Sequence, residues 1–236
     1  MTKTITSWMF FAILGATLGG TAVPAAAGPD KSEKEKEKER LEKEKAEKAA
    51  GDAAVEAQAA QEREVRQAAE QLANDTAAVM EKWIVNQATS QDKLFARLYF
   101  PILNSSPTKY NTQYDQLAER DVVPLEDKAL QTNTSFQYAI VTDSNGYIPA
   151  HNTRFNQPMS GNAAQDYANS RSKRMLGDTA SLIAARSEAK YLILRNKLET
   201  GEVVYDLSVP ITVRGKHWGC ARVGYKKLPD PKPSSE

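Results

Sequence analysis

The stretch that decides the fold is Val203-Val-Tyr-Asp-Leu-Ser-Val-Pro-Ile-Thr-Val213. Every odd-numbered position in it is apolar, whereas Asp206 and Ser208 stand among the even-numbered ones. Alternation with a period of two is typical of a β-strand that buries one face. The loops 199–201 and 214–216 both contain glycine, which favours a hairpin on each side of this strand. The pattern therefore predicts three consecutive antiparallel strands, at 191–198, 203–213 and 217–225.

Two further strands are predicted upstream. Residues 136–143 are rich in β-branched and aromatic side chains, and the turn signal Ser144-Asn-Gly146 leads into a second strand at 147–151. Residues 162–176 and 180–185 are expected to form helices between the second and third strands. The predicted fold class is α+β, with a long N-terminal helix packed on a PAS-like five-stranded antiparallel sheet and helices inserted after strand two.

The N-terminal half is repetitive and polar. Residues 28–51 are rich in Lys and Glu whose charges nearly cancel, so we expect a solvated spacer or a frayed helix there. Residues 52–90 are rich in Ala, and Val65, Leu72 and Val79 recur seven apart, which predicts a helix with a narrow apolar stripe. This helix either packs on the following domain or forms a coiled-coil homodimer.

The first residues have the features of a signal peptide. Lys3 precedes an apolar run over 8–18, and Ala25-Ala-Ala27 follows Pro24. This predicts export to a bacterial periplasm, and an uncleaved membrane anchor is the alternative. The formal net charge of +1 gives no reason to expect a nucleic-acid partner. The predicted segments are a signal peptide at 1–27, the charged spacer at 28–51, the Ala-rich helix at 52–90, a compact domain at 91–226 and a disordered tail at 227–236.

Little in the sequence points to catalysis. A single cysteine, Cys220, excludes an internal disulfide, a thiolate zinc site and a CxxCH haem attachment. His217 and Cys220 are three apart in a predicted strand, so they are expected on opposite faces, which argues against a dyad. The sequence has no P-loop, GxSxG motif or cluster of metal ligands. We therefore expect no catalytic residues, no metal and no cofactor.

Polar candidates for ligand binding lie in and around the insertion. His151 follows the second strand, and its ring can both donate and accept a hydrogen bond. Arg171 and Arg174 are three apart on the predicted inserted helix, so they would share a face and could clamp a carboxylate or phosphate. Asp206 is an acidic residue in an apolar strand and would hold a ligand ammonium or Arg174.

Two aromatic residues complete the predicted site. Tyr147 and Trp218 would supply apolar walls to a pocket, although such residues are also common in protein cores. The polar candidates likewise have ordinary structural interpretations, as a loop-bonded histidine, a solvated helix face and the wet side of a strand. The predicted ligand-binding set is His151, Arg171, Arg174, Asp206, Trp218 and Tyr147.

Four segments occur in a recognisable order: DSNGYIPAHN at 143–152, NSRSKRMLGD at 169–178, GEVVYDLSVPI at 201–211 and GKHWGCARVGY at 215–225. They resemble segments of the PAS-like Cache sensory domains of bacterial methyl-accepting chemotaxis proteins, and the likeness spans about residues 91–226. The methyl-accepting helical hairpin and the HAMP-like linker of those receptors have no counterpart in this sequence. The resemblance implies signal sensing without catalysis.

The expected function is therefore periplasmic binding of a small ligand by a sensory protein, with an anionic ligand as the finer hypothesis and a membrane receptor as a further partner. One alternative is a structural or protein-interaction role for the charged segment and the Ala-rich helix. Another is a sensor that binds haem non-covalently through His151 or His217.

Overall fold

The computed structural model describes residues 32–197 and 201–230. The predicted signal peptide at 1–27 lies outside the described residues. The chain divides into two compact units, Met1–Ala46 and Glu47–Glu236. No helix among the described residues is both long enough and apolar enough to cross a membrane.

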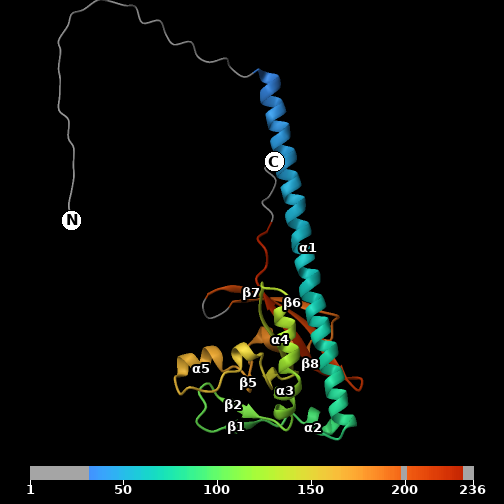
Figure 1. Ribbon diagram of the computed structural model, residues 1–236, viewed down its shortest axis with the longest axis vertical. Coiled ribbons are helices and arrows are strands. Elements are labelled where there is room, and N and C mark those ends of the chain that lie inside the picture. Colours follow the sequence, from blue (N-terminus) through green and yellow to red (C-terminus); the bar gives the residue numbers. More distant parts are fainter. Residues whose placement is uncertain (1–31, 198–200, 231–236) are drawn as a thin grey trace, which may run out of the picture. The chain divides into compact units, whose positions relative to one another are not determined.

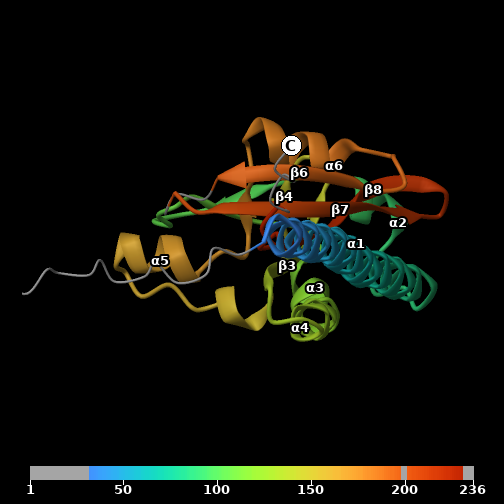
Figure 2. The same cartoon turned by 90° about the horizontal axis from the view of Figure 1, so that it is seen from above.

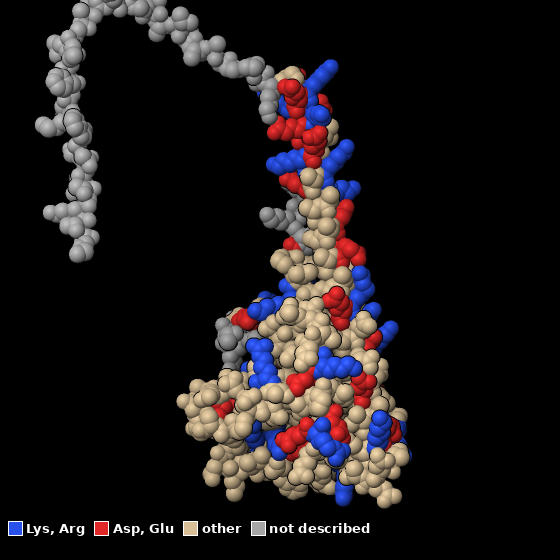
Figure 3. All heavy atoms as spheres, in the orientation of Figure 1, with Lys and Arg blue, Asp and Glu red and all other residues tan. Residues whose placement is uncertain are grey.

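The first described element is a single long helix, α1 (Glu33–Val85). Its first part is exposed, and Lys and Arg alternate with Asp and Glu along it (Figure 3). Leu41 interrupts the Lys/Glu alternation, so oppositely charged residues meet four apart, as in Lys38–Glu42 at 3.9 Å and Arg40–Glu44 at 3.7 Å. Such pairs support a helix modestly. The segment predicted as a spacer or a frayed helix is therefore helical.

The predicted apolar stripe of α1 packs on the domain that follows. Val65, Leu72 and Trp83 are buried and belong to the main core. The indole nitrogen of Trp83 donates a hydrogen bond to Asp121 at 2.6 Å, which fixes the last turns of the helix. The packing interpretation of the stripe is confirmed, and a homodimer through α1 stays a prediction.

The main sheet is antiparallel with the strand order β3-β8-β7-β6. The predicted long strand is β7 (Val203–Val213), and its neighbours are β6 (Leu192–Lys197) and β8 (Lys216–Tyr225). The other edge is β3 (Phe136–Asp143). The odd-numbered side chains of β7 face the main core, as their alternation predicts.

The prediction of five strands is wrong, because the main sheet has four. The predicted second strand is reduced to β4 (Tyr147–Ile148), which pairs with β5 (Arg174–Met175) in a separate two-stranded sheet. Pro149 follows β4 and has no N–H to donate to a ladder. Further along, an isolated bridge between Ile140 and His151 pairs this segment with β3.

Side chains occupy the place of the missing strand. The carboxylate of Glu126 accepts a hydrogen bond from the Val141 N–H at 2.9 Å, and the Asn152 amide donates to the Ala139 carbonyl at 3.1 Å. Backbone groups at a buried sheet edge need such partners. Glu126 belongs to α4 (Val123–Gln131), which packs along β3.

The predicted inserted helix at 162–176 is also wrong in its second half. The helix α5 (Ala163–Asn169) ends early, and the chain then turns into β5. Lys173 has a φ of 64°, which a continuing α-helix cannot contain. The second predicted inserted helix is confirmed as α6 (Thr179–Arg186).

The sheet is covered on both faces (Figures 1 and 2). The later part of α1 lies with α4 and α3 (Asp115–Asp121) on one face, and α6 lies on the other. We call these the helix-packed face and the α6 face. The short elements at the edges are α2 (Gln91–Phe95), β1 (Phe100–Ile102), β2 (Lys109–Asn111) and the 3-10 turn η1 (Thr153–Phe155).

Candidate functional site

The α6 face of the sheet carries a row of polar side chains. Strand register places Ile140 opposite Arg222 and Arg222 opposite Ser208, and directly opposed residues share a face. The bridge from Ile140 to His151 extends this row to the insertion. In the neighbouring row Asp206 stands opposite Gly224. Two predicted site residues, His151 and Asp206, are thus brought to the same sheet face.

Asp206 forms a buried ion pair with Arg222, a residue that the sequence analysis missed. The two side chains are 1% and 2% exposed, and both Nε and Nη2 of Arg222 donate to Oδ2 of Asp206, the former at 2.9 Å. The same Oδ2 also accepts from the Tyr138 hydroxyl at 2.8 Å and from Asn196 at 3.2 Å. Asp206 therefore holds Arg222, and the prediction that it could hold Arg174 is wrong.

This ion pair leaves hydrogen-bonding atoms unused. Oδ1 of Asp206 and Nη1 of Arg222 are buried without a partner among the described residues. Because buried polar atoms are normally satisfied by protein or water, each such atom calls for an explanation. The pair consequently offers one acceptor and one donor to a molecule bound between the sheet and the insertion.

Tyr138 is positioned by the absence of a side chain on the next strand. Its ring lies over Gly224, where a Cβ atom would come within 2.3 Å of the ring carbons. Burial, followed by the nearby Asp206 carboxylate, raises the pKa of the Tyr138 phenol. The phenol therefore stays protonated and donates to Asp206.

His151 lies at the insertion end of the polar row and is 2% exposed. Its ring packs edge-on against Phe155, with 5.1 Å between ring centroids, and its Nδ1 is buried without a partner among the described residues. Burial, with a contribution from the charges of Arg171 and Arg174, lowers the pKa of His151 to about 3. The imidazole is therefore neutral at physiological pH.

Arg171 and Arg174 do not share a helix face, because α5 ends before them. The guanidinium of Arg171 lies 4.7 Å from the Phe155 ring centroid, and that of Arg174 lies 4.4 Å from the Tyr167 ring centroid. Both lie near enough to His151 to depress its pKa. They line the insertion side of the site, each held by an aromatic ring.

Tyr147 and Trp218 lie apart from this polar row, in the main core. Both side chains are fully buried. The Tyr147 hydroxyl donates to Asp115 at 2.9 Å, and the Trp218 ring packs edge-on against Tyr114 with 6.0 Å between centroids. The structure therefore does not bring these two predicted residues together with Asp206 and His151.

The aspartate of the DSNGY segment stabilises the turn after β3. Asp143 is fully buried and accepts from the backbone N–H groups of Asn145 and Tyr147 through one oxygen, and from the Tyr99 hydroxyl at 2.6 Å through the other. Arg97 lies 3.4 Å from the second oxygen. These contacts give Asp143 a structural role in positioning β4 and the insertion.

A bulge in β8 explains why Arg222 and Cys220 reach the α6 face. Thr212 pairs with His217 but Ile211 pairs with Gly219, so Trp218 is an extra residue. The slip places His217 and Cys220 on the same face, and the prediction of opposite faces is wrong. Nε2 of His217 lies 2.8 Å from the Ala185 carbonyl, and burial raises the pKa of the Cys220 thiol to about 11.

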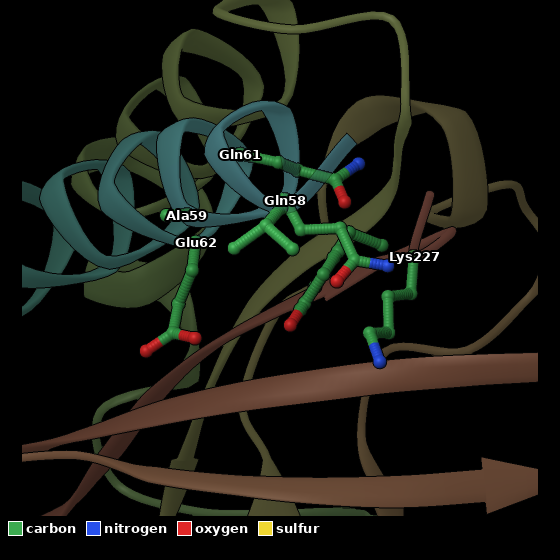
Figure 4. A pocket seen from close by; sticks show the side chains of 7 residues that line it. Gln58, Ala59, Gln61, Glu62 and Lys227 are labelled. Atoms are coloured by element: carbon green, nitrogen blue, oxygen red, sulfur yellow. The ribbon is translucent and has the colours of Figure 1, made fainter. Parts of the chain in front are cut away.

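Two cavities lie near the end of β8, away from α6. The first, of about 280 Å³, lies between α1 and the end of β8 and is shown in Figure 4 with Gln58, Gln61 and Lys227 at its walls. The second, of about 360 Å³, adjoins it and is lined by Tyr205 and residues 226–230. The α6 face itself is covered, since Asp206 and Arg222 are buried there, and the predicted pocket beneath the insertion stays a prediction.

The first residues after β8 lie against α1, and the predicted disorder of the tail at 227–236 stays a prediction. Oε1 of Gln61 accepts from the Leu228 N–H at 3.0 Å and its Nε2 donates to the Lys226 carbonyl at 2.9 Å, while Gln58 donates to Pro229 at 2.7 Å. These bonds fasten the chain after β8 to α1. Residues 231–236 lie outside the described part of the chain.

Among the described residues, no group of three or more His, Cys, Asp or Glu side chains could hold a metal ion. No protein-family model matches the sequence, and no curated protein matches it. Among solved structures, the chain is similar to the extracellular ligand binding receptor from Desulfohalobium retbaense DSM5692, with a TM-score of 0.33 and 14% sequence identity. The likeness covers 67% of this chain and 24% of that receptor, so the chain spans about a quarter of the receptor's length.

Proposed function

We propose that this chain is an exported, non-catalytic sensory protein whose α6 face binds a small molecule. The observation that carries the proposal is the buried Asp206–Arg222 pair, in which one atom of each side chain has no partner within the described part of the chain. Because an unmet buried hydrogen bond costs roughly 1–3 kcal/mol, a ligand that supplied the missing donor and acceptor would be bound favourably. The arrangement suits a ligand that completes the pair.

The chemistry of the site favours a ligand with both a donor and an acceptor. Oδ1 of Asp206 requires a donor, such as a hydroxyl or ammonium group, and Nη1 of Arg222 requires an acceptor. The neutral His151 ring provides a further unpartnered nitrogen at the end of the row. Arg171 and Arg174 lie on the insertion side and favour a ligand with a carboxylate or phosphate group.

The same residues argue against catalysis. The Cys220 thiol is 1% exposed, and with a pKa near 11 it is protonated at neutral pH, whereas nucleophilic cysteines are thiolates. The His217 ring is 2.8 Å from a backbone carbonyl instead of a nucleophile. Binding with a conformational response is the simpler use of these groups.

Ligand entry requires the cover of the α6 face to move. α6 contacts the sheet through Ala184 and Ala185, which pack on Cys220 and Leu194. Small side chains give this contact little apolar area, so separation is less costly there than at the helix-packed face. Opening of the insertion on ligand binding would provide the signal, and a homodimer or a membrane receptor would read it.

The test is a thermal-shift screen of the intact chain with organic acids, amino acids and purines, followed by calorimetry on each hit. Asp206→Asn keeps the size of the side chain and Tyr138→Phe removes one donor, and we expect at least a tenfold loss of affinity in the first. Glu81→Gln, at an exposed ion pair with Arg214, is the matched control and should bind normally. Binding of a hit that is unchanged in Asp206→Asn would contradict the proposed site.

A second candidate function is a structural or protein-interaction role for α1. It is favoured by the covered α6 face and by apolar side chains that α1 leaves exposed, Leu41 at 45% and Val55 at 55%. In that case no compound would stabilise the intact chain. Cross-linking of the chain at Val55 to a partner, with no ligand found, would then support this function.

A further inference from the structure

Lys109 is a buried lysine on β2, which belongs to the small β1–β2 sheet. The Asp206–Arg222 pair lies on the main sheet instead. Lys109 is 7% exposed, and its ammonium group donates a hydrogen bond to the Ser170 hydroxyl at 2.7 Å. Ser170 itself is 1% exposed and follows the end of α5. Backbone pairing of Tyr110 with Lys173, at 2.8 Å, joins β2 to the segment that precedes β5.

The partner of Lys109 is neutral, which is unusual for a buried charge. Among the described residues, no carboxylate lies within 4.0 Å of the Lys109 Nζ. The nearby carboxylates are bonded to other residues. Glu119 pairs with Lys173 at 3.6 Å, and the Asp166 carboxylate accepts from the Ser160 and Gly161 N–H groups. Buried charges normally have an opposite charge beside them, because desolvation is costly.

Charged side chains of both signs surround Lys109. Burial lowers the pKa of Lys109, and the like charges of Arg174 and Lys173 lower it further, against smaller opposing effects of Asp166 and Glu119. Arg174 is held in place by the Tyr167 ring and by a bond from its Nη1 to the Tyr167 carbonyl at 2.9 Å. An ammonium group that is buried against a neutral partner would be stabilised by an anion from solution.

We propose that Lys109, Ser170 and Arg174 form a second binding site, for the oxyanion of a small carboxylate or phosphate. An ammonium group has three N–H donors, and Ser170 uses one of them. The Ser170 hydroxyl accepts from Lys109 and so keeps its own hydrogen to donate. Arg174 adds a guanidinium of fixed orientation, and such forks suit planar or tetrahedral oxyanions.

This site does not include the Asp206–Arg222 pair of the proposed ligand site, although Arg174 lies on the insertion side of both. Asp206 and Arg222 neutralise each other, whereas Lys109 and Arg174 have a net positive charge to offer. An anion here would fasten β2 to the segment between α5 and β5, and so would hold the insertion in one conformation. Binding of the anion would therefore stabilise the conformation in which α6 covers the sheet.

The experiment titrates the intact chain with sodium phosphate, sulfate and acetate at constant ionic strength and follows the thermal midpoint. We expect saturable stabilisation by at least one of them, with an apparent affinity about tenfold weaker in Lys109→Met and Arg174→Met. Lys216→Met, at an exposed lysine of β8, is the control and should not change the titration. Asp206→Asn should leave it unchanged as well, which separates this site from the ligand site.

A second measurement needs no substitution. Lysine acetylation of the intact chain, followed by mass spectrometry, compares Lys109 with Lys216 in the presence and absence of the stabilising anion. We expect the anion to slow acetylation of Lys109 several-fold and to leave Lys216 unaffected. No saturable effect of any of the three anions, or equal protection of both lysines, would overturn the proposal.

Discussion

The two faces of the sheet are built by different means from the same strands. On the helix-packed face the odd-numbered residues of β7, such as Leu207 and Ile211, pack with α1 and α4 in one apolar core. On the α6 face the even-numbered residues Asp206 and Ser208 join a polar row beneath a short helix. The helix-packed face is mainly apolar, whereas the α6 face holds a buried ion pair whose Asp206 Oδ1 and Arg222 Nη1 have no partner among the described residues.

The difference indicates where the protein can respond to a ligand. Apolar packing contributes stability in proportion to the buried area, and it offers no hydrogen-bonding groups to a small polar ligand. A buried ion pair contributes little net stability but is strongly sensitive to its partners. We therefore expect the helix-packed face to determine stability and the α6 face to determine binding, and the following predictions test that division.

The largest effect is expected from breaking the buried ion pair on one side. Arg222→Met leaves the Asp206 carboxylate buried without its cation, and we expect a loss of roughly 3–5 kcal/mol in the free energy of unfolding. Adding Asp206→Leu to the same chain should restore much of it. Urea denaturation followed by circular dichroism measures both, with Arg214→Met, at an exposed ion pair with Glu81, as the control. If the double variant were as unstable as Arg222→Met alone, the unpaired Asp206 charge would not be the cause of the loss. The loss would then come from packing, as on the helix-packed face.

Adjacent residues of β7 provide the next comparison. Leu207 is fully buried on the helix-packed face, so Leu207→Ala should cost about 2–5 kcal/mol through the cavity it leaves. Ser208, the next residue, donates a long hydrogen bond of 3.4 Å to the Leu192 carbonyl, and Ser208→Ala should cost about 1 kcal/mol or less. Urea denaturation of the two variants tests this order, and equal losses would contradict the division between the faces.

Acid should weaken the α6 face first. The pKa of His151 is lowered to about 3 in the folded chain, so folding excludes the proton that the unfolded chain binds near pH 6.5. The stabilisation is complete above about pH 6.5 and is lost as the pH falls towards 3, by roughly 2 kcal/mol at pH 5. His151→Gln should remove this part of the pH dependence, measured as unfolding free energies at pH 7 and pH 5. If the unfolding free energy of the variant fell with pH as steeply as that of the parent chain, folding would not lower the pKa of His151.

Alkali should weaken the helix-packed face, where Glu126 is completely buried. Burial raises the pKa of the Glu126 carboxyl well above its usual range, so the folded chain favours the protonated acid. Its stability is therefore highest below the ordinary carboxyl pKa and falls as the pH rises above it. Glu126→Gln keeps an oxygen for the Val141 N–H and should be more stable than the parent chain at pH 8. This advantage should shrink at pH 4, and an advantage independent of pH would exclude ionisation as its cause.

The smallest effect is expected at the hydrogen bonds that join Gln61 of α1 to the residues after β8. Gln61→Ala removes both bonds to residues 226 and 228, and we expect a loss of about 1 kcal/mol or less. Hydrogen exchange at the Leu228 amide should become several-fold faster. Gln71→Ala, which breaks a bond to Asp75 on the same helix, is the control and should leave that amide unchanged.

The sequence by itself determined the elements whose periodicity is strong. The limits of β7 follow from six alternating apolar residues between two glycine-containing loops, and the buried stripe of α1 follows from its heptad spacing. The place of the insertion followed as well, because α6 begins at a capping residue, Asp178, whose carboxylate accepts from the Ser181 N–H. Local preferences decided these features, since each depends on residues close together in the chain.

Only the tertiary structure decided the pairing of the strands and the members of the polar row. Pro149 and the side chains of Glu126 and Asn152 replace a fifth strand, through contacts between residues far apart in the chain. The extra residue Trp218 shifts the β7–β8 register by one, so Arg222 stands opposite Ser208 instead of Leu207. Since a slip of one residue exchanges the two faces of a strand, that bulge alone brings Arg222 to Asp206.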